Sequence, residues 1–280
     1  MSTPQTIRLR VSCPDRPGIV AAISGFLFAR RANIVHADQH STEERFFLRL
    51  VASLDTSDSV EAVRSEIETV AGDFSMELQL SVPNEEKRVA LLVSSYAHCL
   101  LDLLWRFEQG ELEGRPALVV SNHPDLRART ESHSIPYHHV PAPADGRAEA
   151  EAEMLELLKG VDLLVLARYM QILSKEFLDR VGAPAINIHH SFLPAFAGAN
   201  PYRRAVERGV KIIGATAHYV TDELDAGPII EQDVARVSHR DTVSDVQRIG
   251  RDVERVVLAR AVKLHLEDRV LVDGGRTVVF

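Results

Sequence analysis

The hydrophobic pattern of the chain changes near residue 88, and this change constrains the possible folds more than any other feature. Before it, apolar and polar residues alternate, as in residues 7–12, where Ile7, Leu9 and Val11 share one face. After it, apolar residues follow one another directly, as in Val-Ala-Leu-Leu-Val at residues 89–93. Alternation is typical of half-buried strands, whereas continuous runs are typical of strands buried on both faces of a parallel sheet. The sequence therefore predicts two domains built around different kinds of sheet.

The first domain, predicted over residues 1–84, alternates strands and helices in the order βαββαβ. The expected strands cover residues 7–12, 33–40, 45–54 and 76–82, and the expected helices cover 18–32 and 58–72. Asp58 and Glu61 have the spacing of a capping box at the start of the second helix. This order is that of a ferredoxin-like fold. The polar segment 83–87 is expected to link this domain to the next.

The second domain, predicted over residues 85–280, alternates buried strands with helices. Apolar runs at residues 89–93, 117–120 and 161–166 predict strands, and helical patterns occupy residues 100–107 and 148–158 between them. A longer helix is expected after Asp241. Such alternation predicts a Rossmann-like, doubly wound α/β domain with a mostly parallel sheet.

The composition argues against several classes of function. The formal net charge of -8 disfavours a nucleic-acid partner, because binding to phosphates needs a basic face. The two cysteines, Cys13 and Cys99, form no CxxC pair and predict neither a redox motif nor a cysteine zinc site. No apolar run reaches membrane-spanning length, and the N-terminus lacks the core of a signal peptide. We therefore expect a cytoplasmic protein that has no membrane partner.

The loop after the first strand of the second domain lacks the glycines of a nucleotide-binding site. Residues 94–99 read Ser-Ser-Tyr-Ala-His-Cys, and no glycine occurs between Gly72 and Gly110. This argues against a dinucleotide dehydrogenase and against a P-loop enzyme, because both cradle phosphates with glycine-rich loops. We expect the protein to need no cofactor.

The densest polar cluster runs from Asn187 to Ser191, directly after the short apolar strand 184–186. Ligand sites of open α/β sheets lie beyond the carboxyl ends of strands. Because side chains alternate along a strand, Asn187 and His189 are expected on one face and His190, with a structural role, on the other. An Asn amide and a His can together polarise a carbonyl and stabilise the oxyanion that develops on it.

Asp225 and His218 are the candidates further along the chain. Asp225 begins the turn Asp-Ala-Gly-Pro, which can present a carboxylate, although aspartate also favours such turns for conformational reasons alone. His218 lies in the apparent strand 212–220 and suits either hydrogen-bonding support or direct contact with a ligand. Asn187 and His189 can likewise be ordinary hydrogen-bonded groups at a strand end. Only the joint placement of these residues beyond strand ends favours a functional site.

A zinc hydrolase and a serine nucleophile are the weaker alternatives. His189, His190, His218 and Asp225 are common types of zinc ligand, but no HExxH or HxH spacing is present. We therefore expect no metal. Ser191 lacks the GxSxG elbow of serine hydrolases.

Three motifs of the second domain resemble the 10-formyltetrahydrofolate-dependent formyltransferases. They are Asn187-Ile188-His189 with residues 191–198, His218 with residues 221–228, and the segment Leu166-Ala167-Arg168-Tyr169-Met170-Gln171-Ile172-Leu173. The loop Cys13-Pro14-Asp15-Arg16-Pro17-Gly18, with Asn33-Ile34, resembles an ACT regulatory domain. An ACT domain followed by a formyltransferase-like domain resembles the formyltetrahydrofolate deformylases over nearly the whole chain.

This resemblance implies hydrolysis of 10-formyltetrahydrofolate to formate and tetrahydrofolate, with water as the formyl acceptor. Asn187 and His189 would bind the formyl oxygen, and Asp225 would pair with His189 and assist proton transfer from water. His218 would support them by hydrogen bonds. The folate would be held by Met170, Gln171, Ile172, Leu173, Val220, Thr221 and Asp222. Two alternatives remain open: a formyltransferase to a small amine, and a non-catalytic sensor of folate or an amino acid.

The ACT resemblance also implies regulation and assembly. Glycine or methionine would be the effector, with Asp15, Gly18 and Asn33 near its site, unless this domain serves oligomerisation alone. Pairing of ACT-type sheets would make the protein a homo-oligomer.

The sequence departs from the transferases in two places: Ser95-Tyr96-Ala97-His98 replaces a glycine-rich phosphate loop, and Gln171 stands where many relatives carry Arg. The first departure favours water as the acceptor.

Overall fold

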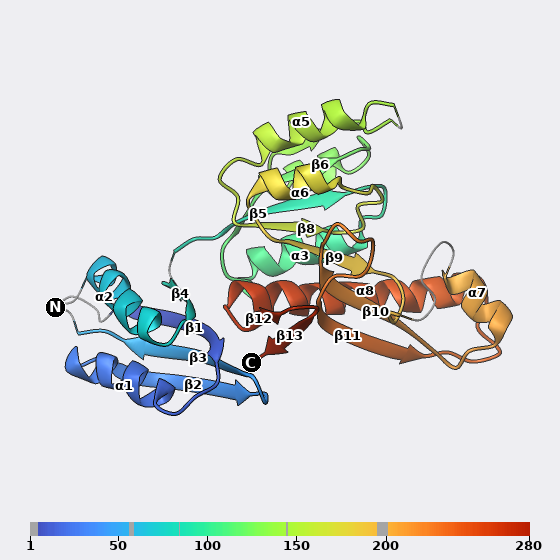
Figure 1. The fold of residues 1–280 in the computed structure, drawn as a ribbon. Coiled ribbons are helices and arrows are strands. Elements are labelled where there is room, and N and C mark those ends of the chain that lie inside the picture. Colours follow the sequence, from blue (N-terminus) through green and yellow to red (C-terminus); the bar gives the residue numbers. More distant parts are fainter. Residues whose placement is uncertain (1–4, 56–58, 84, 144, 195–200) are drawn as a thin grey trace. The chain divides into compact units, whose positions relative to one another are not determined.

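The computed structural model describes the chain except residues 1–4, 56–58, 84, 144 and 195–200. The chain divides into two compact units (Figure 1). The first contains Met1–Glu85, Glu267–Asp273 and Thr277–Phe280, and the second contains Glu86–Leu266 and Gly274–Arg276. The first unit thus combines the N-terminal residues with most of the C-terminal segment.

The first unit has the predicted βαββαβ order. Its elements are β1 (Thr6–Pro14), α1 (Ile19–Ala29), β2 (Asn33–Ser41), β3 (Arg45–Ser53), α2 (Val60–Asp73) and β4 (Glu77–Ser81). The strands form an antiparallel sheet in the order β2-β3-β1-β4. The ferredoxin-like fold expected from the sequence is therefore confirmed.

The residue before each helix of this unit explains where the helix begins. Helix α1 follows Gly18, whose φ of 98° lies in the left-handed region that glycine adopts without steric cost. Helix α2 is capped by Ser59, whose side chain accepts a hydrogen bond from the Ala62 amide. Asp58, which the sequence predicts as the start of this helix, lies outside the described residues.

Strand β1 is buried on both faces, although its alternation predicts burial on one. Ile7, Leu9 and Val11 belong to the core that α1 and α2 share with the sheet. The opposite face carries Arg8, which is also buried, because the C-terminal segment covers it. The difference arises because a segment some 260 residues away in sequence supplies the partners of this polar face.

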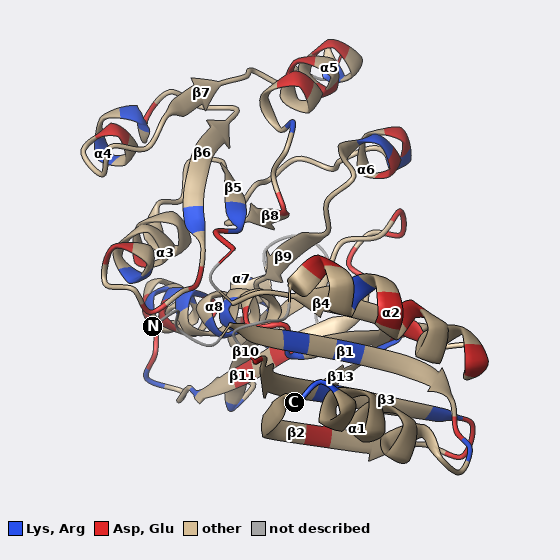
Figure 2. Cartoon of the chain, turned by 90° about the vertical axis from the view of Figure 1, so that its left-hand side faces the viewer, with Lys and Arg blue, Asp and Glu red and all other residues tan. Residues whose placement is uncertain are grey.

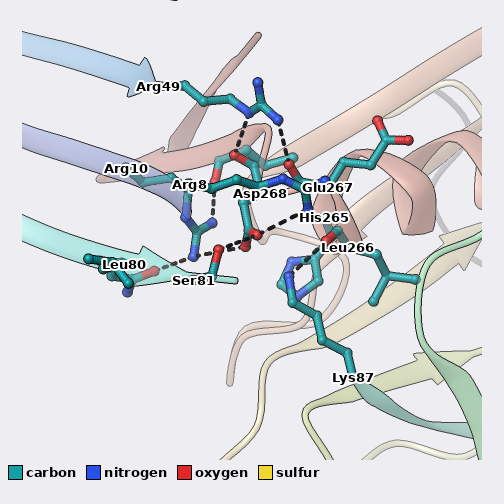
Figure 3. A network of polar contacts seen from close by, with 12 residues as sticks. Arg8, Arg10, Arg49, Leu80, Ser81, Lys87, His265, Leu266, Glu267 and Asp268 are labelled. Carbon is teal, nitrogen blue, oxygen red and sulfur yellow. Dashed lines mark hydrogen bonds and ion pairs between the residues drawn. The ribbon is translucent and has the colours of Figure 1, made fainter. Parts of the chain in front are cut away.

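Asp268 is the centre of this covered face (Figure 3). Its carboxylate accepts a hydrogen bond of 2.7 Å from the Ser81 hydroxyl and lies 3.6 Å from Arg8 and 3.9 Å from Arg10. Arg49 donates to the backbone oxygens of Asp268 and Glu267 at 3.0 and 2.9 Å. Buried guanidinium groups need such partners, because an unpaired buried charge is strongly destabilising. The short strands β12 (Val270–Asp273) and β13 (Arg276–Val279) follow.

The second unit is a doubly wound α/β domain. Its elements are β5 (Arg88–Val93), α3 (His98–Glu108), β6 (Arg115–Ser121), α4 (Arg127–Glu131), β7 (Tyr137–His139), α5 (Arg147–Leu157), β8 (Leu163–Leu166), α6 (Lys175–Val181), β9 (Ala185–His189), α7 (Pro201–Arg208), β10 (Ile212–Tyr219), β11 (Ile229–Arg236) and α8 (Val243–Leu266). The sheet order is β11-β10-β9-β8-β5-β6-β7. Strands β5 to β9 pair in parallel and β10 and β11 antiparallel, which confirms a mostly parallel sheet.

Helices cover both faces of this sheet, so its central strands are buried. Every residue of β8 and all but the first of β5 are buried, as their continuous apolar runs predict. Helices α5 and α6 pack on one face, and α3 and α8 lie on the other (Figure 1). Acidic and basic side chains occur together on α4, α5 and α6 (Figure 2). No helix in the described part of the chain is long and apolar enough to cross a bilayer.

We expect Asp268→Ala to lower the free energy of unfolding of the first unit by about 3 kcal/mol, because it leaves the Arg8 and Arg10 charges without their carboxylate. Chemical denaturation followed by circular dichroism measures the loss. Asp73→Ala, at an exposed helix end, is the control and should change stability by under about 0.5 kcal/mol. Equal stability of the two variants would contradict this account of the covered face.

Candidate active site

Asn187 and His189 of β9 point into one cavity of the second unit. They lie two residues apart at the carboxyl end of a parallel strand and line a cavity of about 580 Å³. They share a face because side chains alternate along a strand, as the sequence predicts. Asn187 is half-buried, and only 6 % of His189 is exposed. The pair is therefore fixed by the strand rather than by a loop.

The antiparallel pairing of β10 with β9 brings His218 beside Asn187. The two residues are register partners, as are Thr216 and His189. His218 Nδ1 lies 2.8 Å from the Tyr219 carbonyl oxygen, and His218 Nε2 lies 3.3 Å from Asn187 Nδ2. A neutral His218 that donates from Nδ1 accepts at Nε2 from the amide. This bond orients the amide and leaves its second N–H available.

The carboxylate of Asp225 joins the two imidazoles. Asp225 Oδ2 lies 3.1 Å from His189 Nδ1, and Asp225 Oδ1 lies 3.7 Å from His218 Nε2. His189 Nε2 is buried and has no hydrogen-bond partner among the described residues. One nitrogen of His189 is thus held by the carboxylate, while the other is open to a ligand in the cavity.

The backbone around Asp225 is shaped to present this carboxylate. Asp225 has a φ of 57°, a left-handed conformation that aspartate tolerates better than most residues. A Cβ atom on Gly227 would lie 1.8 Å from the Tyr219 carbonyl oxygen, so only glycine fits there. The amide of Tyr219 in turn donates to the Pro228 oxygen at 2.9 Å. The loop therefore closes tightly on β10 and returns Asp225 to the cavity.

The surroundings of Asp225 favour its charged form. The hydrogen bond from His189 and, next, the nearby His218 imidazole hold the pKa of the Asp225 carboxyl well below its usual value, although burial acts in the opposite direction. The carboxylate therefore stays ionised through the neutral range. It can orient His189 and stabilise positive charge on it.

The Thr216 hydroxyl fixes the chain that leaves β9. It donates to the Ser191 carbonyl oxygen at 2.9 Å and accepts from the Leu193 amide at 3.0 Å. Gln232 donates to the same hydroxyl at 2.9 Å. Residues 195–198 of the first motif lie outside the described residues.

His190 lines the same cavity as His189, so the expectation that it faces away is wrong. Its ring lies 5.2 Å from the His189 ring and 5.9 Å from the Tyr202 ring. The alternation rule fails here because β9 ends at His189. Burial, and next the charge of Arg168, lower the pKa of His190 to about 4, so it is neutral at pH 7.

The residues predicted to hold the folate all line the cavity. They are Met170, Gln171, Ile172, Leu173, Val220, Thr221 and Asp222. Met170 and Ile172 are each more than half exposed, although both are apolar. Exposed apolar side chains at a cavity mouth favour a ligand with a large apolar surface.

A buried charged network that sequence reasoning missed also lines the cavity. Glu254 of α8 is 1 % exposed, accepts hydrogen bonds from His98 at 2.7 Å and from Tyr202, and lies 3.4 Å from Arg168 Nε. Gly250, one turn earlier, leaves space for the Tyr202 ring. The signal was an acidic residue within the apolar stripe of α8, at helical spacing from Val246 and Gly250.

His98, Cys99 and Glu254 have possible metal-ligand atoms within 4.8 Å of one another. Burial and then the Glu254 charge hold the pKa of the Cys99 thiol well above its usual value, so the thiol stays protonated. The close contact of His98 and Glu254 is a hydrogen bond. The expectation that the site needs no metal stays a prediction.

The three predicted effector residues lie in the first unit, on its surface. Asp15 and Gly18 belong to the loop between β1 and α1, and Asn33 begins β2, an edge strand of the sheet. All three are exposed. Their role as an effector site stays a prediction.

We expect Asp225 to make folding stability depend on pH. Its folded pKa lies below the unfolded value of 3.8, so the unfolded chain binds more protons as the pH falls, and stability is lost. Between pH 6 and pH 3, the wild type should lose about 1 kcal/mol more than Asp225→Asn. Denaturant unfolding at both pH values measures this difference. Parallel losses in both proteins would contradict the low pKa.

The chain matches two family models and many known proteins. The model described as formyl transferase matches residues 87–262, and the ACT domain model matches residues 7–71. A formyltetrahydrofolate deformylase from Mycobacterium bovis is 54% identical over 279 residues, which cover 98% of this chain and 90% of the relative.

Solved structures give the same result. A crystal structure of a formyltetrahydrofolate deformylase from Pseudomonas syringae matches with a TM-score of 0.96 and 49% identity, and the match covers 100% of this chain and 96% of that chain. Glycinamide ribonucleotide transformylase 1 from Symbiobacterium toebii matches with a TM-score of 0.67 and 33% identity over 72% of this chain and 98% of that chain. The site, both family models and these full-length relatives agree: the chain belongs to the formyltetrahydrofolate deformylase family.

Proposed function

We propose that the protein hydrolyses 10-formyltetrahydrofolate to formate and tetrahydrofolate, with water as the formyl acceptor. One observation carries the proposal: His189 Nε2 is buried without a partner beside the Asn187 amide, while its Nδ1 faces Asp225. Two donors that converge on one cavity suit a carbonyl oxygen that gains negative charge. The names of the full-length relatives support the same reaction.

In the proposed mechanism, Asn187 and His189 bind the formyl oxygen. Water attacks the formyl carbon, and the carbonyl electrons move to the oxygen that these two residues hold. Asp225 orients the water and stabilises positive charge on His189. The C–N bond then breaks, a proton passes to the departing nitrogen, and formate and tetrahydrofolate remain.

The pterin would bind along the segments 170–173 and 220–222. Met170 and Ile172 offer apolar surface, and the backbone of both segments offers polar groups to the ring edge. Gln171 lines this part of the cavity as well, with a neutral side chain. We expect backbone contacts to contribute more to folate binding than the Gln171 side chain.

Water is favoured over an amine acceptor for a structural reason. The loop after β5 has no glycine, and its side chains Tyr96 and His98 line the cavity. An acceptor with a phosphate finds no cradle of backbone amides there. A formyltransferase to a small amine and a non-catalytic sensor remain the alternatives, and release of formate without an amine separates both from a deformylase.

We expect Asn187→Ala to lower the rate of formate release by about 10²–10³, because it removes one oxyanion donor. Asp225→Asn should lower it at least as much, since asparagine keeps the backbone conformation but not the charge. The assay follows formate from 10-formyltetrahydrofolate with no amine present. Asp179→Asn, on exposed α6, is the control with full activity. Near-full turnover by Asn187→Ala would rule out this assignment.

We further propose that the ACT domain binds an amino acid such as glycine or methionine, and that the protein is a homo-oligomer in the cytoplasm. The exposed loop with Asp15 and Gly18, together with Asn33, supports the effector site. Edge strand β2 supports assembly, because eight of its nine residues are exposed, among them Ile34 and Val35. An unpaired strand edge is a template for pairing with a second copy.

We expect Val35→Lys to shift the protein toward smaller species in analytical ultracentrifugation, because a charged edge strand opposes pairing. Val20→Lys, on the exposed side of α1, is the matched control. If both variants sediment like the wild type as an oligomer, assembly does not use this edge.

A further inference from the structure

The guanidinium group of Arg168 lines the catalytic cavity with its donors unused. The residue is only 8 % exposed, and its Nε is buried without a hydrogen-bond acceptor. Its guanidinium donates no hydrogen bond to any residue in the part of the chain that the structure describes. A buried N–H group without an acceptor is costly, and the planar guanidinium fork suits a ligand with matching acceptors.

The backbone at Arg168 is strained. Its φ of 67° lies in the left-handed region, where a long side chain is uncommon. Ser94 holds this conformation, because its amide donates to the Arg168 carbonyl oxygen at 3.2 Å and its hydroxyl accepts from the Met170 amide at 2.9 Å. Such strain is typical of functional positions, and here it directs a buried arginine to the cavity.

Glu254 balances the charge of Arg168 without occupying its fork. Its carboxylate oxygens already accept hydrogen bonds from His98 and Tyr202, and the nearest Arg168 atom is Nε at 3.4 Å. Burial acts to raise the pKa of Glu254, but the His98 hydrogen bond and the Arg168 charge outweigh it, so the net pKa is lowered. Glu254 therefore stays charged, and the N–H donors of the Arg168 guanidinium group remain available to a ligand.

Arg168 lies in the same cavity as the reacting groups. His190 lies between the two sets of residues: its ring contacts that of His189 at 5.2 Å and that of Tyr202 at 5.9 Å. Tyr202 in turn donates to Glu254. The Tyr96 ring stands 5.3 Å from the Arg168 guanidinium carbon and limits the space beside it. A small ligand fits such a place better than a large one.

We propose that Arg168 is the binding site for formate, the carboxylate product, in the cavity that His189 also lines. This inference rests on the proposed hydrolysis, which turns a neutral formyl group into an anion. A carboxylate offers two oxygens that match the arginine fork in a bidentate pair. Glu254 is assigned as a positioning residue because it lies beside Arg168, and His98 and Tyr202 support it through their hydrogen bonds to Glu254.

The experiment measures formate binding directly and without folate. Sodium formate labelled with ¹³C is titrated into the full-length protein, and its line width reports binding, with sodium chloride at equal ionic strength as the salt control. Arg168→Gly is the main variant, because glycine adopts the left-handed backbone without strain. Arg168→Lys keeps the charge but loses the fork. Arg248→Gln, an exposed arginine on α8 outside the lining of the cavity, is the matched control.

We expect Arg168→Gly to weaken formate binding about tenfold or more, and Arg168→Lys to weaken it less, while Arg248→Gln matches the wild type. The formate inhibition constant in the deformylase assay should rise by the same factor. Circular dichroism confirms that each variant is folded. If Arg168→Gly does not fold, Arg168→Lys decides the question.

Asp225→Asn separates this inference from the proposed function. It should lose hydrolysis but still bind formate, since Arg168 is intact. Formate binding that is unchanged in folded Arg168→Gly and Arg168→Lys overturns the assignment to Arg168, even if the protein hydrolyses its substrate. Formate that binds the wild type no better than chloride overturns it as well. If the wild-type protein does not hydrolyse 10-formyltetrahydrofolate, the proposed function itself is refuted.

Discussion

The pairing of β10 with β9 is the constraint on which the site depends. It is antiparallel, whereas β9 pairs with β8 in parallel, and it sets His218 opposite Asn187 and Thr216 opposite His189. One register therefore positions the amide, both imidazoles and the hydroxyl that holds the outgoing loop. A shift of one residue would turn each of these side chains to the other face of the sheet. The geometry of the site is thus a property of strand pairing, to which the Asp225 loop adds the carboxylate.

Local patterns predicted most of the fold. Alternation in residues 7–12 and the continuous run at 89–93 distinguished an antiparallel sheet from a parallel one, although the polar face of β1 is buried as well because the C-terminal segment covers it. The same reasoning placed Asn187 and His189 on one face. It failed at His190, which follows the last residue of β9 and no longer obeys the alternation of a strand.

Residues whose partners lie far away in sequence could not be predicted. Arg8 looked like a solvated residue, but its partner Asp268 comes 260 residues later. Glu254 interrupts the apolar stripe of α8, but its segment does not reveal its partner, and only the tertiary fold brings Arg168 and Glu254 together beside His190. A buried ion pair depends on two residues that are far apart in sequence, so the pair cannot be predicted from either residue alone. The positive φ of Arg168 is likewise a property of the folded chain.

The first unit consists of segments that are far apart in sequence, and this affects when it can finish folding during synthesis. Residues 1–85 leave the ribosome well before Glu267–Asp273. Domains tend to fold as they emerge, the N-terminal one first. Here the nascent N-terminal sheet lacks the Asp268 carboxylate beside Arg8 and Arg10, and the backbone acceptor of Arg49, until Asp268 has been synthesised. The first unit is therefore completed only after residues 86–266 have been synthesised, and a truncation before Glu267 removes part of the first unit as well.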